Sequence, residues 1–286
     1  MTAEANPVPR GAAGALWRSC HPGPTVVVSV LALLLGLSTG LDAARLALFV
    51  GAVGAGQLSV GWSNDAIDAR RYTEVGRRDK PIARGEITAR TVAVAAGLAL
   101  LVAVGLSVLL GWGFLAAHTA ALVSAWGYNA WLKRTAASVV PFAVSFGLFP
   151  SLATLAAAEP SFASPWATAA GAALGLAVHF SNVLPDLDDD AATGVRGLPH
   201  RLGARTSAIT AFAALATGAG AVTAGAVVAG AASPVTLVGL LAVLAIGATG
   251  LVRALRRPDR TVFRLVMLAA LALVLLLAAT GVRLTT

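Results

Sequence analysis

The chain has 286 residues, of which 57% are hydrophobic and only 12% are Asp, Glu, Lys or Arg. A soluble domain carries about 25% charged residues, so these charges are too few for a polar shell and a soluble globular protein is almost excluded. The mean hydropathy of +0.81 agrees. The same numbers exclude a disordered, collagen-like or coiled-coil chain. The single cysteine, Cys20, excludes an internal disulfide framework and a CxxC metal site.

Apolar runs long enough to cross a membrane recur along the whole chain. A spanning helix needs roughly 20 mostly apolar residues. Nine such runs occur, at about 24–40, 43–63, 91–111, 113–132, 138–157, 166–184, 206–230, 234–252 and 262–282. We therefore expect an all-α integral membrane protein with nine transmembrane helices. A cytoplasmic N-terminal segment, 1–23, would precede a single transmembrane domain over 24–286.

The basic residues are unevenly distributed between the loops. With nine spans and a cytoplasmic N-terminus, nineteen of the 21 Lys and Arg residues fall on one side, and only Arg45 and Arg283 fall on the other. This is the asymmetry that the positive-inside rule describes, and it places the C-terminus outside. The net charge of +8 therefore marks the cytoplasmic face rather than a nucleic-acid partner. The excess of Arg over Lys and the abundant Ala suggest a bacterial source, and so the bacterial plasma membrane.

Nine of the thirteen acidic residues lie in two cytoplasmic segments, within the loops at about 64–90 and 185–205. In both segments an Asn is followed four residues later by an Asp. This spacing places the side chains on one helical face, about one turn apart. The first cluster contains Asn64, Asp65 and Asp68, and the second contains Asn182, Asp186 and Asp190.

Carboxylates stacked at membrane depth repel each other and are costly to desolvate, and a bound cation removes both problems. Oxygen ligands without Cys or paired His suit Mg²⁺, which completes its shell with water and substrate phosphate. A solvated helix cap explains either cluster alone about as well, but two matched clusters favour a metal site. The predicted metal ligands are Asn64, Asp65, Asp68, Asp186 and Asp190, and nearby bases for a diphosphate are Arg77, Arg78, Lys80, Arg84 and Lys133.

These residues resemble the motifs of the UbiA family of intramembrane prenyltransferases, which has nine transmembrane helices and two Asp-rich motifs, NDxxDxxxD and DxxxD. Asn64, Asp65 and Asp68 match the first motif, and Asp186 and Asp190 match the second. The stretch Asp79-Lys80-Pro81-Ile82-Ala83-Arg84-Gly85 is similar to the family's basic segment after the first motif. Tyr128 and Lys133 resemble its Tyr…Lys element. The resemblance covers nearly the whole chain.

Two positions depart from the family pattern. Tyr72 stands where the third acid of the first motif is expected, and Gly197 replaces the usual Thr before Leu198-Pro199. The first departure removes one expected metal ligand.

The resemblance implies Mg²⁺-dependent allylic substitution. The metal and basic residues would stabilise charge developing on the diphosphate, while the isoprenyl cation forms in a water-poor chamber and is attacked by a lipophilic, typically aromatic, acceptor. The implied partners are a prenyl diphosphate, that acceptor and membrane lipid, with no nucleic acid and no obligate protein partner. The implied catalytic residues are Asp68, Asp186, Lys133 and Tyr128, and the implied diphosphate-binding residues are Arg77, Lys80, Arg84, Lys133, Asn64 and Asn182.

Two other functions remain open from the sequence. A terpene cyclase of the same superfamily would use the same site without an acceptor. A secondary transporter also fits buried acids and internal similarity, but carriers place charges near the bilayer midplane, whereas both clusters here lie at helix ends beside basic loops.

The four histidines carry weaker signals. His179 lies near the second cluster and is a candidate for orienting substrate or accepting a proton, although a packing role is favoured. Packing is also the expectation for His118, and His21 and His200 are expected to be ordinary loop residues.

Overall fold

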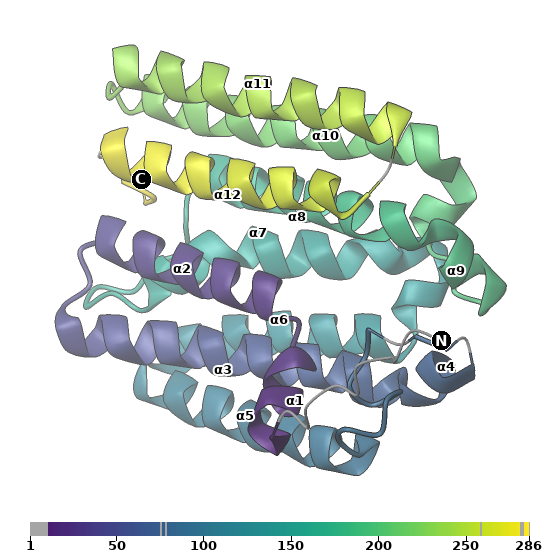
Figure 1. Ribbon diagram of the computed structural model, residues 1–286. Helices are drawn as coiled ribbons and strands as arrows, with labels where there is room; N and C mark the ends of the chain where they lie inside the picture. The colour runs from purple at the N-terminus through teal and green to yellow at the C-terminus, as the bar shows by residue number, and fades with distance from the viewer. Residues whose placement is uncertain (1–10, 75, 78, 258, 281–282, 286) are drawn as a thin grey trace.

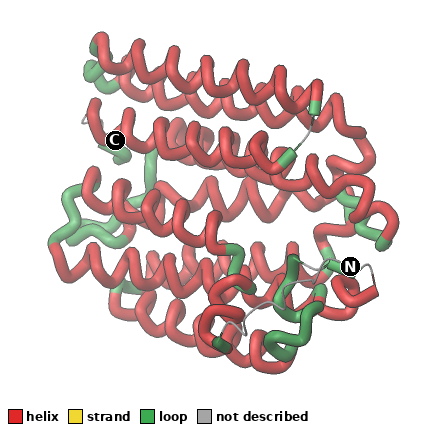
Figure 2. Tube along the Cα trace, viewed as in Figure 1, coloured by secondary structure: helices red, strands yellow, loops and turns green. Residues whose placement is uncertain are grey.

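The computed structural model describes residues 11–74, 76–77, 79–257, 259–280 and 283–285. Within these residues all regular structure is helical and no strand occurs (Figure 2). The α-helices are α1 (Ala12–Arg18), α2 (Pro22–Ser38), α3 (Ala43–Ile67), α4 (Ala69–Glu74), α5 (Ala89–Leu109), α6 (Trp112–Ala130), α7 (Val140–Leu155), α8 (Pro165–Val183), α9 (Leu187–Ala192), α10 (Leu198–Val228), α11 (Pro234–Arg256) and α12 (Arg260–Thr280). Three 3₁₀ turns are η1 (Leu132–Arg134), η2 (Ala136–Val139) and η3 (Leu184–Asp186).

The long helices lie side by side in one bundle, with α10 and α11 at one edge and α5 at the other (Figure 1). The most extensive helix contacts are between α3 and α5, between α8 and α10, and between α7 and α8. The short helices α4 and α9 lie at the same end of the bundle, as does the turn from α11 to α12. The pairing of Arg260 with Asp79, at 3.4 Å, links that turn to the segment after α4.

The chain is an integral membrane protein by the length and apolarity of its helices, but the predicted count of nine spans is not confirmed. Each of the nine predicted ranges contains a helix. Seven helices are long and apolar enough to cross a membrane, and α1 with α2, bent by 71° at their junction, would form an eighth span. Helix α2 has only 17 residues, and α6 carries His118, Tyr128 and Asn129, which lower its hydropathy. The seven helices cover Ala43–Ile67, Ala89–Leu109, Ala136–Leu155, Pro165–Asp186, Leu198–Val228, Pro234–Arg256 and Arg260–Ala279.

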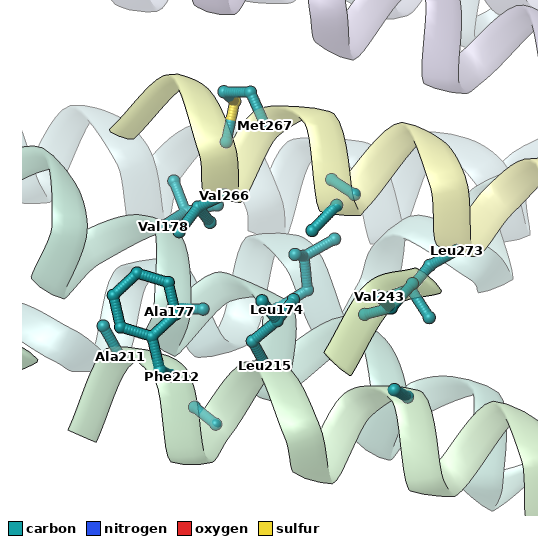
Figure 3. Close-up of a cluster of buried hydrophobic side chains, with 14 of the residues drawn as sticks. Leu174, Ala177, Val178, Ala211, Phe212, Leu215, Val243, Val266, Met267 and Leu273 are labelled. Atoms are coloured by element: carbon teal, nitrogen blue, oxygen red, sulfur yellow. The ribbon is translucent and has the colours of Figure 1, made fainter. Parts of the chain in front are cut away.

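Two large groups of buried apolar side chains form most of the core, and a small third group contains Ala15, Ile87 and Val92. One joins α8, α10, α11 and α12 and includes Leu174, Phe212, Leu215 and Val243 (Figure 3). The other joins α2, α3, α6 and α7, and contains an edge-on contact between Phe49 and Phe114 with ring centroids 5.9 Å apart. The groups are connected, because four partly buried side chains pack against both. These are Phe146, Phe149, Trp166 and Val274.

Small residues bring α8 into backbone contact with α7. A Cβ added at Gly171 would lie 2.2 Å from the carbonyl oxygen of Phe146, and one at Gly175 would lie 2.3 Å from that of Phe142. No side chain fits at these distances. Helix contact through glycine is a common solution in membranes, where van der Waals packing has to drive helix association.

Replacing Gly175 by Ala is expected to destabilise the protein by about 1–3 kcal/mol, because the added methyl group forces α7 and α8 apart. The matched control is Gly220→Ala on α10, where no described atom lies within 4 Å of the added Cβ. Unfolding in detergent, followed by circular dichroism against denaturant concentration, measures both variants. Equal stability of the two would show that the α7–α8 contact tolerates a side chain.

Candidate active site

One chain of ion pairs joins the two acidic clusters. Lys133 in η1 directs its Nζ to Asp68 Oδ1 at 2.6 Å and to Asn64 Oδ1 at 3.4 Å. Arg71 in α4 donates to Asp190 Oδ1 at 2.8 Å and to Asp68 Oδ2 at 3.4 Å. A single guanidinium therefore bridges clusters that lie more than a hundred residues apart in the sequence.

The local sequence explains how these side chains reach one place. Asp68 is the C-terminal cap of α3, and its N–H donates to the Asn64 carbonyl at 3.0 Å, so both side chains lie one turn apart and meet Lys133. The second cluster is different, because Pro185 interrupts the helix. Asn182 ends up in α8, Asp186 in η3 and Asp190 in α9, so the single helical face predicted from the spacing is not continuous.

The segment before α10 packs closely against the turn that contains Lys133, which explains why Gly197 stands where the family usually has Thr. A Cβ at this position would lie 2.8 Å from both the Lys133 carbonyl oxygen and Ser138 Oγ. Ser138 in turn accepts a hydrogen bond from the Leu198 N–H at 2.8 Å. The start of α10 is therefore seated directly on the turn that carries Lys133, and glycine makes this possible.

A second group surrounds Asp65, which is fully buried. Its Oδ1 accepts from the Tyr72 hydroxyl at 3.1 Å and from Lys80 Nζ at 2.8 Å, and lies 3.0 Å from His21 Nε2. Its Oδ2 is buried without a partner among the described residues. Burial and the neighbouring carboxylates Asp65 and Asp68 raise the pKa of Tyr72 well above its usual value, so this hydroxyl stays protonated and donates.

The positive and negative charges of the site compensate one another, although burial removes part of their hydration. Burial raises the pKa of Asp190, and the carboxylate of Asp186 raises it further, while Arg71 opposes both. Burial lowers the pKa of Lys133, and its pairing with Asp68 counters that effect. The carboxylates are therefore crowded and depend on neighbouring positive charge.

Of the other predicted site residues, Arg77 is linked to this centre and Arg84 lies farther out. Arg77 pairs with Asp79 at 2.9 Å, interacts electrostatically with Asp186 and packs over the Tyr72 ring. Arg84 pairs with Glu86 at 2.7 Å, on the outer side of the segment between α4 and α5. Arg78 lies outside the described residues.

Tyr128 packs edge-on against Phe142, with ring centroids 5.0 Å apart, and lies within electrostatic range of Asp68 and Asp190. Asn182 is exposed, and neither its side chain nor that of Asp186 forms a hydrogen bond within the described ranges.

Sequence reasoning missed three residues. The motifs do not single out Arg71, although it lies three residues after Asp68, a spacing at which helical side chains meet. The expectation that His21 and His200 are ordinary loop residues is wrong. His21 contacts Asp65, and His200 Nε2 lies 3.7 Å from Asp190 Oδ2. The available signal is that both histidines lie next to apolar runs, in the same predicted set of loops as the acidic clusters.

The donor set fits Mg²⁺, although the described residues contain no three His, Cys, Asp or Glu side chains already gathered around one point. The potential ligands are oxygens only, which this ion prefers. Among the described residues, the buried Asp65 Oδ2 and the half-buried Asp186 carboxylate accept no hydrogen bond. Such an arrangement of carboxylates and interleaved bases can bind divalent cations together with a polyanion.

Comparisons with known proteins agree on one family. The model of the UbiA prenyltransferase family matches residues 24–267. The apo structure of a UbiA homologue from Aeropyrum pernix K1 is similar with a TM-score of 0.73 and 17% identity, over 88% of this chain and 95% of that one. A UbiA homologue from Archaeoglobus fulgidus bound to GPP and Mg²⁺ gives 0.69 and 12%, over 93% and 99%. Digeranylgeranylglyceryl phosphate synthase gives 0.71 and 12%, over 95% and 99%. No curated protein sequence matches the chain.

Lys133→Met is expected to destabilise the protein by about 3–5 kcal/mol, because it leaves the buried Asp68 carboxylate with a single, longer contact to Arg71. Adding Asp68→Asn should recover part of this loss. The control is Glu74→Gln, which breaks the exposed Arg70–Glu74 pair and should change stability by no more than about 0.5 kcal/mol. Denaturant unfolding of the four proteins forms the test. A Lys133→Met loss as small as that of the control would contradict the buried-pair interpretation.

Proposed function

Because the chain belongs to the UbiA prenyltransferase family, we propose that it transfers an isoprenyl group from a prenyl diphosphate to a lipophilic acceptor within the membrane, with Mg²⁺ as cofactor. The observation that carries this proposal is the Arg71 bridge between Asp68 and Asp190, which brings both acidic motifs to one site at the end of apolar helices. The homologues bound to GPP or DMAPP with Mg²⁺ support it.

Five residues would hold the metal ions: Asn64, Asp65, Asp68, Asp186 and Asp190. When bound, Mg²⁺ neutralises the negative charge that builds up on the diphosphate as the C–O bond breaks. Arg71 and Lys133 now neutralise Asp68 and Asp190. In the substrate complex, these two cations would turn toward the diphosphate oxygens as the carboxylates take up the metal.

Further bases surround the same end of the bundle. Lys80 is anchored on Asp65 and lies 4.9 Å from the centroid of the Tyr72 ring, so its ammonium group is held near the first motif. Arg77 interacts electrostatically with Asp186 and would therefore place positive charge next to the second motif. Arg84 would bind the diphosphate from the outer edge of the site. The amides of Asn64 and Asn182 would donate hydrogen bonds to the remaining diphosphate oxygens.

The isoprenyl cation needs an environment that stabilises positive charge and excludes water. Tyr128 and Phe142 place aromatic rings next to the acidic centre, and aromatic faces attract cations. The apolar helices beyond them limit quenching by water. The acceptor, typically an aromatic ring, would attack the cation and then lose a proton.

We place the end that carries α4 and α9 at the cytoplasmic face of a bacterial plasma membrane, because the basic loops gather there. The N-terminal segment would then be cytoplasmic and the C-terminus outside. Counting α6 and the bent α1–α2 pair with the seven apolar helices gives nine spans. The activity would belong to a single domain, 24–286, since shared side chains join both halves of its core.

Purified protein with Mg²⁺ and a panel of prenyl diphosphates is expected to release diphosphate only when an aromatic acceptor is present. Product analysis by mass spectrometry should then show the prenylated acceptor. Release without acceptor, together with a cyclic hydrocarbon, would instead identify a terpene cyclase. No release under any condition would refute both enzyme functions for that panel.

Asp186→Ala is expected to lower diphosphate release at least about 100-fold, because it removes a metal ligand that no described residue replaces. Asp189→Asn is the matched control, since Asp189 is exposed three residues away and should leave the rate within about twofold. Asp68→Ala should behave like Asp186→Ala. Near wild-type rates for either Ala variant would exclude the two-cluster metal site.

A further inference from the structure

A small, half-open cavity between the helices contains polar groups that the proposed chemistry does not use. It has a volume of about 60 Å³ and lies between α2, α3, α6 and α7. Its walls are mostly apolar, with side chains such as Val28, Leu122 and Phe149. Three polar side chains also line it, namely Gln57 of α3, His118 of α6 and Ser145 of α7.

The tautomer of His118 follows from its neighbour. Ser107 Oγ lies 2.6 Å from the Ala103 carbonyl oxygen, and this carbonyl can only accept, so Ser107 donates its proton there. Ser107 Oγ also lies 2.8 Å from His118 Nδ1 and must accept from it, so the proton of the imidazole is on Nδ1. His118 Nε2 is consequently a hydrogen-bond acceptor.

No partner for this acceptor is found in the described part of the chain. His118 is only 4% exposed. A Cβ added at Gly56 would lie 3.0 Å from Nε2 and would therefore crowd this nitrogen. His118 lines the cavity, so an acceptor there without a protein donor is free to bind a donor from a ligand.

The other two polar groups complete the site. Ser145 Oγ donates to the Ala121 carbonyl at 3.1 Å, so its oxygen is left to accept. The half-buried amide of Gln57 forms no hydrogen bond within the described residues and can either donate or accept. His118 Nε2 and Ser145 Oγ can each accept a hydrogen bond, and the Gln57 amide can donate one. This set suits a hydroxyl group, which donates one hydrogen bond and can accept another. The cavity has room for a hydroxyl and the carbon that bears it, since a water molecule occupies about 30 Å³ in the liquid.

The cavity lies well inside the bundle from the acidic centre. Gln57 precedes Asn64 by seven residues on α3, or roughly 10 Å of helix, and His118 precedes Tyr128 by ten residues on α6, or roughly 15 Å. A ligand that reaches both places is therefore lipophilic and extended.

We propose that Gln57, His118 and Ser145 form a binding subsite for a hydroxyl group on a lipophilic ligand, and that this hydroxyl donates to His118 Nε2. The subsite rests on the proposed function for the identity of that ligand. The hydroxyl would belong either to the acceptor or to the far end of the isoprenoid chain.

Nuclear magnetic resonance of ¹⁵N-histidine-labelled protein in detergent tests the subsite without relying on turnover. The chain has four histidines, and His118→Gln identifies the His118 signals. The free protein should show His118 protonated on Nδ1. At least one hydroxyl probe, 1-naphthol or 8-hydroxygeranyl diphosphate, should shift the Nε2 signal, whereas its matched compound without that hydroxyl, 1-methoxynaphthalene or geranyl diphosphate, should leave it in place. A proton on Nε2, or equal shifts within both pairs of probes, would overturn the proposal.

Binding measurements distinguish the two sources of the hydroxyl. One arm compares 1-naphthol with its methyl ether, and the other compares 8-hydroxygeranyl diphosphate with geranyl diphosphate. The wild-type protein should prefer the hydroxyl compound by about tenfold in one arm. His118→Phe and Gly56→Ala should abolish that preference, His118→Gln should retain part of it, and Gly220→Ala should keep it.

Failure of this inference is distinguishable from failure of the proposed function. Binding of geranyl diphosphate to every variant shows that each is folded and that the diphosphate site is intact. If the wild-type protein binds geranyl diphosphate but shows no hydroxyl preference in either arm, the subsite is refuted and the transferase proposal stands. If no prenyl diphosphate binds while His118 still responds to naphthol, the transferase proposal fails and the subsite stands.

Discussion

Buried charge compensation between Asp68, Arg71, Lys133 and Asp190 is the constraint on which the rest of the structure depends. Carboxylates at the ends of apolar helices repel each other and lose their hydration, so they persist only where positive charge is within reach. The chain meets this requirement with one guanidinium and one ammonium group placed between two acidic motifs. A polyanion with divalent cations presents the same complementary charges, which is why an ion-paired cluster and a substrate site can occupy one place.

This constraint fixes where the helices end. For Asp68 and Lys133 to meet, α3 and α6 have to terminate at the same level of the bundle, and for Arg71 to reach Asp190, α4 and α9 have to fold back over that end (Figure 1). Proline in the second motif and glycine before α10 allow these changes of direction. The replacement of a motif acid by Tyr72 fits the same logic, because a neutral hydroxyl donates to Asp65 where another carboxylate would repel it.

The sequence was a good guide wherever a single local property decides the outcome. Long apolar runs produced helices at all nine predicted places, and the spacing of Asn64 and Asp68 placed both side chains on Lys133. It was a poorer guide where the outcome depends on contacts between distant segments. Four-residue spacing alone could not show that Pro185 breaks the helix between Asn182 and Asp190. The contact of His21 with Asp65 depends on how the bend between α1 and α2 directs this side chain towards α3, and the sequence around the bend does not specify that long-range contact. The number of spans was also ambiguous, because α6 combines an apolar length with polar side chains.

The positions of the polar side chains along α3 and α6 explain what they can do together. Helix α3 holds Gln57 inside the bundle and Asn64 at its end, and α6 holds His118 inside and Tyr128 near its end. Helices are stiff, so the separation between the interior subsite and the acidic centre is set by the backbone and does not adjust to the ligand. A molecule with one polar end and a plain hydrocarbon tail would satisfy the acidic centre but leave His118 Nε2 without a donor. A molecule with a second hydroxyl at the right distance would satisfy both. The same rigid pair of helices that aligns the charged groups can thereby select a lipophilic ligand by the position of its hydroxyl.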